Sequence, residues 1–357
     1  MQNYSIKMIF SNTLIHWYLQ NKRELPWRKI KEPYHIWLSE IILQQTRVNQ
    51  GLQYYENFIA SFPTVFDLAM ADEKTILKLW QGLGYYSRAR NLHFSANYIV
   101  NKLNGKFPET YNDLLQLKGV GDYTASAIAS ICYNEPTAVL DGNVYRVLAR
   151  YLGVNTPVNS TKGNKEFKQL AQELIDKEQP GTYNQAIMEF GAIQCKPQNP
   201  NCTVCPLNSS CIALQEQCIT LLPVKEKKII IKKRFFNYLV ITDQYDNVVI
   251  QHRKKKGIWQ NLYEFPLIET SKEIHLKELL HTNEFFRIVN DYTSTVSLFN
   301  KVVIVHKLSH QHLYTKFWIV SAKEKLANGI SWKDFEKYPV PILIHNFVEN
   351  FKETFKL

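Results

Sequence analysis

The spacing of four cysteines past the middle of the chain constrains its folding more than any other feature. The pattern C-x6-C-x2-C-x5-C is formed by Cys195, Cys202, Cys205 and Cys211. Thiolates gathered in one loop bind either an iron–sulfur cluster or a tetrahedral zinc ion, and ligand chemistry alone does not choose between them. In a chain of 357 residues such clustering favours a metal site over the disulfides of small secreted domains. Cys132 and Cys218 lie outside this loop and are expected to be ordinary thiols.

The composition indicates a folded protein with a basic C-terminal part. Apolar residues make up 45% of the chain, and no apolar run reaches the roughly eighteen residues that a membrane-spanning helix needs. The N-terminus lacks the apolar core of a signal peptide, so we expect a cytoplasmic protein with no membrane contact. The net charge is +11, and 22 basic residues against 14 acidic ones follow residue 220. This excess fits either a nucleic-acid partner or a surplus that keeps the protein soluble.

The apolar pattern changes along the chain and indicates two domains. Residues 1–220 have apolar side chains at helical spacing, so we expect a mostly α-helical region there. A basic linker is expected at 221–234 and an α+β domain at 235–357. The strands expected in this domain are 235–241, 248–253, 301–305 and 315–320, the first two forming a hairpin. Its expected helices are 273–282 and 341–355.

A pair of glycines in the helical region predicts a tight turn. Gly119 and Gly121 stand two residues apart, within a helix–hairpin–helix expected at about 114–130. Glycines at this spacing allow a hairpin whose N–H groups, with the start of the next helix, can hold a DNA phosphate. Taken alone, such a pair between two helices is most often a plain turn.

Two carboxylates are candidates for chemistry. Glu40 lies in the stretch 33–47, which we expect to be one helix with apolar residues one turn before and after it. Such surroundings would raise the pKa of the carboxyl and keep it protonated, whereas an exposed helix glutamate is the commoner case. Asp141 stands in Val-Leu-Asp-Gly-Asn, where the plain alternative is a helix cap.

Three longer motifs bring these features together. They are W-L-S-E-x-x-L-Q-Q-T, G-L-G-Y-Y-x-R-A-R-N-L and V-L-D-G-N-V-x-R-V. With the cysteine loop at 195–211, they make the chain from about Leu25 to Cys211 similar to the MutY adenine DNA glycosylases of the endonuclease III-like helix–hairpin–helix superfamily. The resemblance implies a [4Fe–4S] cluster in the loop. It also implies a DNA repair enzyme that hydrolyses the glycosidic bond of adenine mispaired with 8-oxoguanine or guanine in double-stranded DNA.

The resemblance gives catalytic roles to four residues. Glu40 would protonate N7 of the departing adenine, and Asp141 would stabilise the positive charge left on the sugar. Tyr123 and Asn143 match positions that orient the intermediate and Asp141. Tyr123 also stands where strand-cleaving relatives carry a lysine nucleophile, and a phenol forms no Schiff base. We therefore expect a monofunctional glycosylase.

The resemblance also implies which residues touch DNA. The flipped adenine would be surrounded by Trp27, Arg28, Leu43 and Glu189. The residues expected to wedge beside the opposite base are Gln45 and Tyr85. Those expected to contact the DNA backbone are Gly119, Gly121 and Arg88. A loop that contacts 8-oxoguanine would be formed by Leu308, Ser309 and His310, with leucine in place of the family's phenylalanine.

The second domain resembles, more loosely, the Nudix-like domain of the same family. It lacks the R-E-x-x-E-E run that holds magnesium in Nudix hydrolases, so we expect recognition and no nucleotide cleavage. The expected protein is a monomer that works on the nucleoid. The alternatives are an endonuclease III-like or thymine-mismatch glycosylase, and a non-catalytic DNA-structure sensor. Tyr123 argues against the strand-cleaving version of the first, and Glu40 with Asp141 argues against the second.

Overall fold

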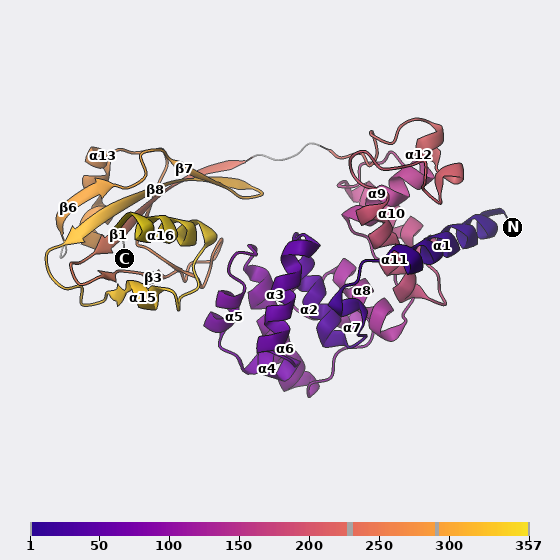
Figure 1. Cartoon of the computed structure of the whole chain (residues 1–357), viewed down its shortest axis with the longest axis horizontal. Coiled ribbons are helices and arrows are strands. Elements are labelled where there is room, and N and C mark those ends of the chain that lie inside the picture. Colours follow the sequence, from indigo (N-terminus) through magenta and orange to yellow (C-terminus); the bar gives the residue numbers. More distant parts are fainter. Residues whose placement is uncertain (1, 227–230, 290–292, 356–357) are drawn as a thin grey trace. The chain divides into compact units, whose positions relative to one another are not determined.

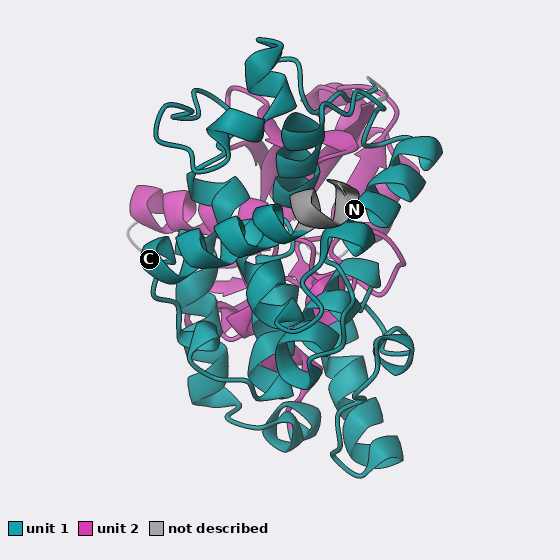
Figure 2. Ribbon diagram, turned by 90° about the vertical axis from the view of Figure 1, so that its right-hand side faces the viewer, with its two compact units in different colours: residues 1–70, 91–227 teal, residues 71–90, 228–357 magenta. Residues whose placement is uncertain are grey.

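The computed structural model describes residues 2–226, 231–289 and 293–355; residues 227–230 of the expected linker lie outside the described residues. Contacts divide the chain into two compact units, which Figure 2 colours separately. Unit 1 comprises residues 1–70 and 91–227, and unit 2 comprises residues 71–90 and 228–357. In the described part of the chain, no helix combines the length and apolar character needed to cross a bilayer.

Unit 1 is built from helices, as the sequence predicts (Figure 1). Its longer helices are α1 (Gln2–Asn21), α2 (Pro33–Leu43), α3 (Val48–Ser61), α6 (Ser87–Leu103), α8 (Asp122–Tyr133), α9 (Gly142–Leu152), α10 (Thr161–Leu174) and α11 (Pro180–Ile193). The shorter ones are η1 (Pro26–Arg28), α4 (Val65–Met70), α7 (Tyr111–Leu114), η2 (Asn208–Ser210) and α12 (Ile212–Gln215). Helix α11 packs against α1, α8 and α9, and α2 packs against α3 and α8. The helices that carry the expected catalytic residues therefore share one core.

Two helix ends shape the backbone near these residues. Helix α9 begins after Asp141, whose side chain accepts hydrogen bonds from two backbone N–H groups of the first turn. The same helix ends before Gly153, which has a left-handed φ of +66°. Helix α2 ends at Leu43, so the prediction of one helix over 33–47 is wrong at its C-terminal end. The reason is Gln45, whose φ of +57° is left-handed and cannot continue a right-handed helix. Its side chain consequently stands on an exposed turn.

Unit 2 is an α+β fold around a sheet, which confirms the predicted fold class. Strand β1 (Lys232–Thr242) runs parallel to β8 (Gln311–Ala322). The strand order is β6-β8-β1-β2-β9, with β5 also paired to β1 and β7 to β8. The remaining strands are β2 (Asn247–Val248), β5 (Leu267–Thr270), β6 (Thr293–Leu298), β7 (Ile304–Lys307) and β9 (Ile330–Ser331), with β3 (Gln251–His252) and β4 (Tyr263–Glu264) forming a separate pair.

Helices pack on both faces of this sheet, because side chains alternate along its central strands. Leu239 and Trp318 belong to a core with α13 (Leu276–Leu280) and α14 (Asn283–Val289). On the neighbouring positions, Tyr238 stacks on Phe317, whose ring centroid lies 3.9 Å from that of Phe347 on α16 (Ile342–Phe355). A further short helix, α15 (Trp332–Phe335), precedes α16.

Two predicted strands of unit 2 differ from the structure. The stretch 248–253 is divided between β2 and β3, which belong to different sheets, and only Thr242 pairs with Val248 across the predicted hairpin. The chain leaves the main sheet because Gln251 pairs with Glu264 of β4 and Arg253 forms a buried ion pair with the same glutamate. The strand predicted at 301–305 begins only at Ile304.

Residues 71–90 belong to unit 2, although the sequence placed them in the helical region 1–220. This segment contains α5 (Glu73–Leu79) and the first residues of α6. The Arg90 guanidinium donates to the carbonyl of Gln260 at 2.8 Å, and the Tyr86 hydroxyl donates to the carbonyl of Val340 at 3.3 Å. These contacts join the segment to the α+β fold, so a domain boundary at residue 220 alone does not describe the chain.

Candidate active site

A cavity of about 600 Å³ in unit 1 collects the expected catalytic and base-binding residues. We call it the unit 1 cavity. The expected residues that line it are Glu40, Asp141, Tyr123, Asn143, Trp27, Arg28, Leu43 and Glu189. Other lining residues, which sequence reasoning did not select, include Arg23, Arg146, Gln185 and Met188. Gln45, by contrast, is not among the described residues that line it.

Glu40 lies on α2 with its side chain buried, whereas the nearby guanidinium groups of Arg23 and Arg28 form ion pairs with Glu189. The pKa of Glu40 is raised to about 7, chiefly by burial and to a smaller extent by the charge of Asp141. A hydrogen bond with Tyr123 and the charge of Arg28 act in the opposite direction. A substantial fraction of this carboxyl is therefore protonated at neutral pH. Burial of the side chain excludes an exposed helix glutamate, and the role of Glu40 as an acid stays a prediction.

Asp141 is both a helix cap and a cavity residue. One carboxylate oxygen accepts the backbone N–H groups of Asn143 at 2.9 Å and Val144 at 2.8 Å, and the other accepts the Asn143 side-chain amide at 2.8 Å. Burial raises the pKa of Asp141, although these hydrogen bonds and the charge of Arg146 act in the opposite direction. The cap and the catalytic interpretation are compatible, because the cap fixes the carboxylate in the cavity wall.

Tyr123 lies in the first turn of α8, directly after the glycine turn. Its hydroxyl contacts the sulfur of Met188 at 3.1 Å, and burial raises the pKa of Tyr123 well above its usual value. Gly119 has φ +87°, and a Cβ there would meet Asn91 at 2.8 Å, so this turn requires glycine. A Cβ on Gly121 would meet nothing within 4 Å, so the backbone at this residue faces open space.

Another buried carboxylate, Glu189, also lines the cavity. Glu189 is 1% exposed and accepts two side-chain hydrogen bonds from Arg23, at 2.8 and 2.6 Å, and two from Arg28, at 3.0 and 2.8 Å. The two guanidinium groups hold the pKa of Glu189 at about 2, against the effect of burial. Arg23 was not predicted from the sequence. Because a buried carboxylate needs a paired cation, an arginine shortly before Trp27 was the available signal.

Arg146 connects the Asp141 carboxylate with the cysteine loop through hydrogen bonds. Its Nε donates to the carbonyl of Cys195 at 2.8 Å, and one terminal nitrogen donates to the side-chain oxygen of Asn143 at 2.8 Å. Because the amide of Asn143 in turn donates to Asp141, a continuous chain of hydrogen bonds runs from the loop to the cavity. A change in the loop can therefore move Asp141.

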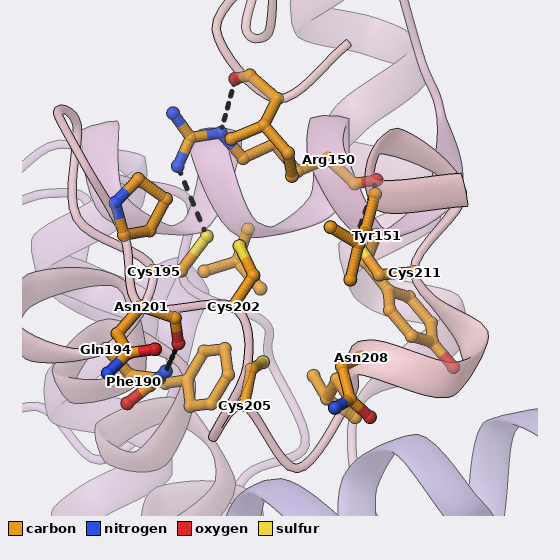
Figure 3. A pocket seen from close by; sticks show the side chains of 15 residues that line it. Arg150, Tyr151, Phe190, Gln194, Cys195, Asn201, Cys202, Cys205, Asn208 and Cys211 are labelled. Carbon is orange, nitrogen blue, oxygen red and sulfur yellow. Dashed lines mark hydrogen bonds between the residues drawn. The ribbon is translucent and has the colours of Figure 1, made fainter. Parts of the chain in front are cut away.

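The four predicted metal ligands line one pocket, which Figure 3 shows with Cys195, Cys202, Cys205 and Cys211 around its central space. Arg150 lies beside them, and one of its terminal nitrogens is 3.5 Å from the sulfur of Cys195. Cys132 and Cys218 are not among the described residues that line this pocket. In the described part of the chain, no three Cys, His, Asp or Glu side chains come close enough to hold a single metal ion.

Unit 2 contains a second cavity, of about 380 Å³, which we call the unit 2 pocket. The expected residues that line it are Tyr85, Leu308, Ser309 and His310. The last three form the turn between β7 and β8, and the hydroxyls of Tyr85 and Ser309 share a short hydrogen bond. Two separate motifs that the sequence could not connect thus meet in one place.

Arg88 does not lie where the sequence suggests. Its side chain is buried, and its guanidinium lies 5.0 Å from the ring centroid of Trp80. Burial lowers the pKa of Arg88 to about 10. The structure thus places the Arg88 guanidinium inside the fold, where it also bonds to protein carbonyls, and a contact of Arg88 with the DNA backbone stays a prediction.

Comparisons with known proteins agree with this architecture. Residues 38–177 match the family model of HhH-GPD superfamily base excision DNA repair proteins, and residues 237–350 match that of the NUDIX domain. The chain is 38% identical to the adenine DNA glycosylase of Buchnera aphidicola subsp. Schizaphis graminum over 264 residues, 73% of this chain and 76% of the relative. It is 34% identical to that of Buchnera aphidicola subsp. Acyrthosiphon pisum over 357 residues, 98% of this chain and 99% of the relative. The structure of a thermostable thymine-DNA glycosylase matches with a TM-score of 0.56 at 27% identity, covering 60% of this chain and 100% of that one.

Fold and site thus define a base excision DNA repair protein of the HhH-GPD superfamily, carrying a C-terminal Nudix-type fold. The similarity to the two Buchnera aphidicola proteins is more specific, because in one case it extends over almost the full length of each chain. The chain belongs to the adenine DNA glycosylase family, whose members are hydrolases that act on N-glycosyl bonds.

Proposed function

We propose that this protein hydrolyses the bond between adenine and deoxyribose where adenine is mispaired with 8-oxoguanine or guanine in double-stranded DNA. One observation carries the proposal: the unit 1 cavity holds Glu40, with a pKa near 7, beside Asp141, which is anchored at a helix start. Two carboxyl groups in unlike environments can divide the roles of acid and charge stabiliser.

The first step is departure of the base. Adenine must leave the duplex to enter the cavity, and as an anion it would be a poor leaving group. The protonated Glu40 gives its proton to N7 of adenine while the C1′–N9 bond breaks, and the bonding electrons stay with the base. Adenine then leaves as a neutral molecule. The ionised Glu189, held by Arg23 and Arg28, supplies acceptors for the amino group of the base.

The second step is capture of the sugar. Loss of adenine leaves an oxocarbenium-like sugar, which the Asp141 carboxylate stabilises directly or captures covalently. A water molecule then bonds to C1′ and gives up a proton to the carboxylate that Glu40 has become. In the covalent case the bond between C1′ and Asp141 breaks in this step, and its electrons return to the Asp141 carboxylate. Tyr123 offers no amine for a Schiff base, so the reaction ends at the abasic site and the strand stays intact.

The DNA partner is a duplex, bound through its backbone. The backbone at Gly121 borders open space directly before the start of α8, so the N–H groups of this turn and of the first turn of α8 can hold a phosphate. The unit 2 pocket supplies Tyr85, Ser309 and His310 for reading 8-oxoguanine, and the exposed Gln45 can insert beside the opposite base. The protein acts as a monomer on the nucleoid.

The cysteine loop is proposed to hold a [4Fe–4S] cluster. The four thiols surround one pocket, but no three stand close enough for one ion, and a tetrahedral zinc would need sulfur atoms at about 2.3 Å from it. A bound cluster would supply cross-links between the loop's cysteines. Anaerobically purified protein should contain about four irons per chain. Cys202→Ser should lower iron content and DNA affinity, whereas Cys132→Ser should not; stoichiometric zinc without iron would overturn the assignment.

One assay tests the proposed reaction. Purified protein is incubated in excess over duplexes carrying adenine opposite 8-oxoguanine, adenine opposite guanine, and thymine opposite guanine, and the products are compared with and without alkali. We expect excision of adenine from the first two, with strand breaks only after alkali. Excision of thymine alone would favour the thymine-mismatch alternative, to which the 27% identical structure lends some weight.

A further inference from the structure

We propose that two arginines, the buried Arg88 and the largely buried Arg253, are positioning residues that hold the two walls of the unit 2 pocket and so set its preference for 8-oxoguanine over guanine. The inference rests on the proposed role of this pocket in reading the opposite base. It adds two residues that stand behind the pocket, since neither belongs to its described lining.

The first wall is the turn that carries Tyr85. Gly82 and Gly84 have φ of +101° and +70°, and Tyr85 itself has φ +47°. A side chain other than glycine keeps this left-handed conformation only when its surroundings impose it. One terminal nitrogen of Arg88 donates to the carbonyls of Leu83 and Gly84, each at 3.2 Å. These bonds fix the two peptide groups directly before Tyr85.

Trp80 holds the same turn before Tyr85. Its indole Nε1 donates to the carbonyl of Gly84 at 3.0 Å, and its ring lies under the Arg88 guanidinium. The backbone N–H of Arg88 also donates to the carbonyl of Tyr85 at 2.9 Å. Arg88 therefore holds the peptide groups on both sides of the Tyr85 Cα, while the Tyr85 side chain stays half exposed.

The second wall is the loop from Gly257 to Trp259. Gly257 and Trp259 have φ of +130° and +59°, and Asn261 has φ +66°. Arg253 donates from Nε to the carbonyl of Ile258 at 3.0 Å, in the middle of the loop. Its backbone N–H donates to the carbonyl of Leu262 at 2.8 Å. The loop is thus tied to one residue on both sides of Trp259.

Glu264 fixes the position of Arg253. Both its carboxylate oxygens accept from one terminal nitrogen of Arg253, at 2.8 and 3.0 Å, and the Tyr238 hydroxyl donates to it at 3.1 Å. Glu264 is 3% exposed, and the side chain of Arg253 is 10% exposed. A buried pair of this kind is rigid, because either charge alone would be costly to bury.

The two arginines therefore do the same work by the same geometry. Each directs a planar group with several N–H donors at carbonyls next to a left-handed residue other than glycine. Lysine keeps the charge but not the fixed fork, so it cannot reproduce these bonds. Arg88→Lys and Arg253→Lys are consequently sharper tests than alanine, because they preserve charge and much of the packing.

The experiment uses the full-length protein and two readouts. Single-turnover excision rates are measured with adenine opposite 8-oxoguanine and opposite guanine, and amide hydrogen exchange is followed over 83–86 and 258–262. The control is Lys316→Gln, which removes a buried cation of the same unit whose ammonium donates to the carbonyl of Ile274 at 2.8 Å, outside the pocket's lining. We expect each lysine variant to speed exchange in its own loop and to lower the ratio of the two rates about tenfold. The control should change neither.

The other outcomes separate two failures. If the wild-type protein excises adenine equally fast opposite both bases, the pocket does not read the lesion, and the proposed function and the inference fall together. If the wild type discriminates but exchange in the loops is unchanged, or exchange rises while the rate ratio stays at the wild-type value, only the positioning role is overturned. An equal loss of discrimination in Lys316→Gln would also overturn the positioning role, because general destabilisation of unit 2 would then explain the effect of the arginine variants.

Discussion

The unit 1 cavity and the unit 2 pocket are built from different kinds of backbone. In the cavity, the working groups sit within or at the start of helices and are buried carboxyls, Glu40 and Asp141. In the pocket, they sit on turns and are neutral hydroxyls, with Tyr85 half exposed and Ser309 exposed. Proton transfer needs a carboxyl whose charge is fixed by its surroundings, whereas reading a base needs donors and acceptors that remain open to it.

Within the cavity, two glutamates show how surroundings decide charge. Both are buried, yet the pKa of Glu40 is raised to about 7 and that of Glu189 is lowered to about 2. The difference is the pair of guanidinium groups on Glu189, which outweighs the cost of burial. Glu40 has a phenol for a neighbour and the carboxylate of Asp141 nearby, so burial decides its state.

The largest expected effect follows from replacing Glu40 by glutamine. The variant keeps the side chain's size but cannot protonate N7, and a positioned general acid contributes about 10²–10⁴-fold. Single-turnover excision should fall by at least that factor opposite both 8-oxoguanine and guanine. The ratio of the two rates should stay near the wild-type value, because the unit 2 pocket is untouched.

Glu56→Gln is the matched control for this variant, since Glu56 is an exposed glutamate on α3. It should excise adenine at the wild-type rate. A Glu40→Gln protein that folds and excises normally would return Glu40 to a structural role. A variant that loses the rate and the discrimination together would show that the two sites do not work separately.

The same substitution should stabilise the protein above neutral pH. The folded-state pKa of Glu40 is about 7 against 4.5 for an ordinary glutamate, so the folded protein holds this proton more tightly. Stability is therefore lost as pH rises from about 4.5 through about 7, by roughly 2–4 kcal/mol for a shift of this size. Glutamine has no proton to lose, so Glu40→Gln should gain over wild type in denaturant midpoint at pH 8 and not at pH 5. An equal difference at both pH values would contradict the burial account.

The pH dependence of excision should show the same group. The acid must carry its proton, so the single-turnover rate should fall about tenfold for each pH unit above about 7, with the same profile opposite both bases. Binding is measured in parallel by fluorescence anisotropy and should change less over that range. A rate that rises with pH above 7 would mean that Glu40 acts as a base.

The sequence predicted the cavity better than the pocket, for a physical reason. Glu40 and Asp141 each lie in a local pattern, an apolar helix and a helix start, that allows the surroundings found, although the resemblance of the longer motifs was needed to select them. The turn at Gly119 was equally predictable from the conformational freedom of glycine. The cysteine spacing likewise placed four thiols around one space. These features depend on residues close together in the chain.

Features that depend on distant contacts escaped the sequence. Arg23 and Glu189 lie far apart in the chain and meet only after α11 has packed, and Arg88 looks like a surface residue until Trp80 and the turn before Tyr85 enclose it. The break of α2 at Gln45 was also missed, since Leu-Gln-Gln-Thr contains neither glycine nor proline to mark it. Such positions are decided by tertiary packing and not by local preference.

The smallest expected effect concerns the neutral hydroxyl groups of the unit 2 pocket. Ser309→Ala removes the hydroxyl that shares a hydrogen bond with Tyr85, but it leaves the hydrogen bonds from Arg88 to the turn before Tyr85 in place. One hydrogen bond between exposed neutral groups contributes about 0.5–1.5 kcal/mol, so the ratio of excision rates opposite 8-oxoguanine and guanine should fall between about twofold and tenfold. The pH profile should stay as in the wild type, because no titrating group is lost. Ser297→Ala, on the exposed side of β6, is the matched control and should leave the ratio unchanged. A loss of rate opposite both bases, with the ratio preserved, would assign Ser309 to general DNA binding, and a shifted pH profile would mean that the pocket also takes part in the chemistry.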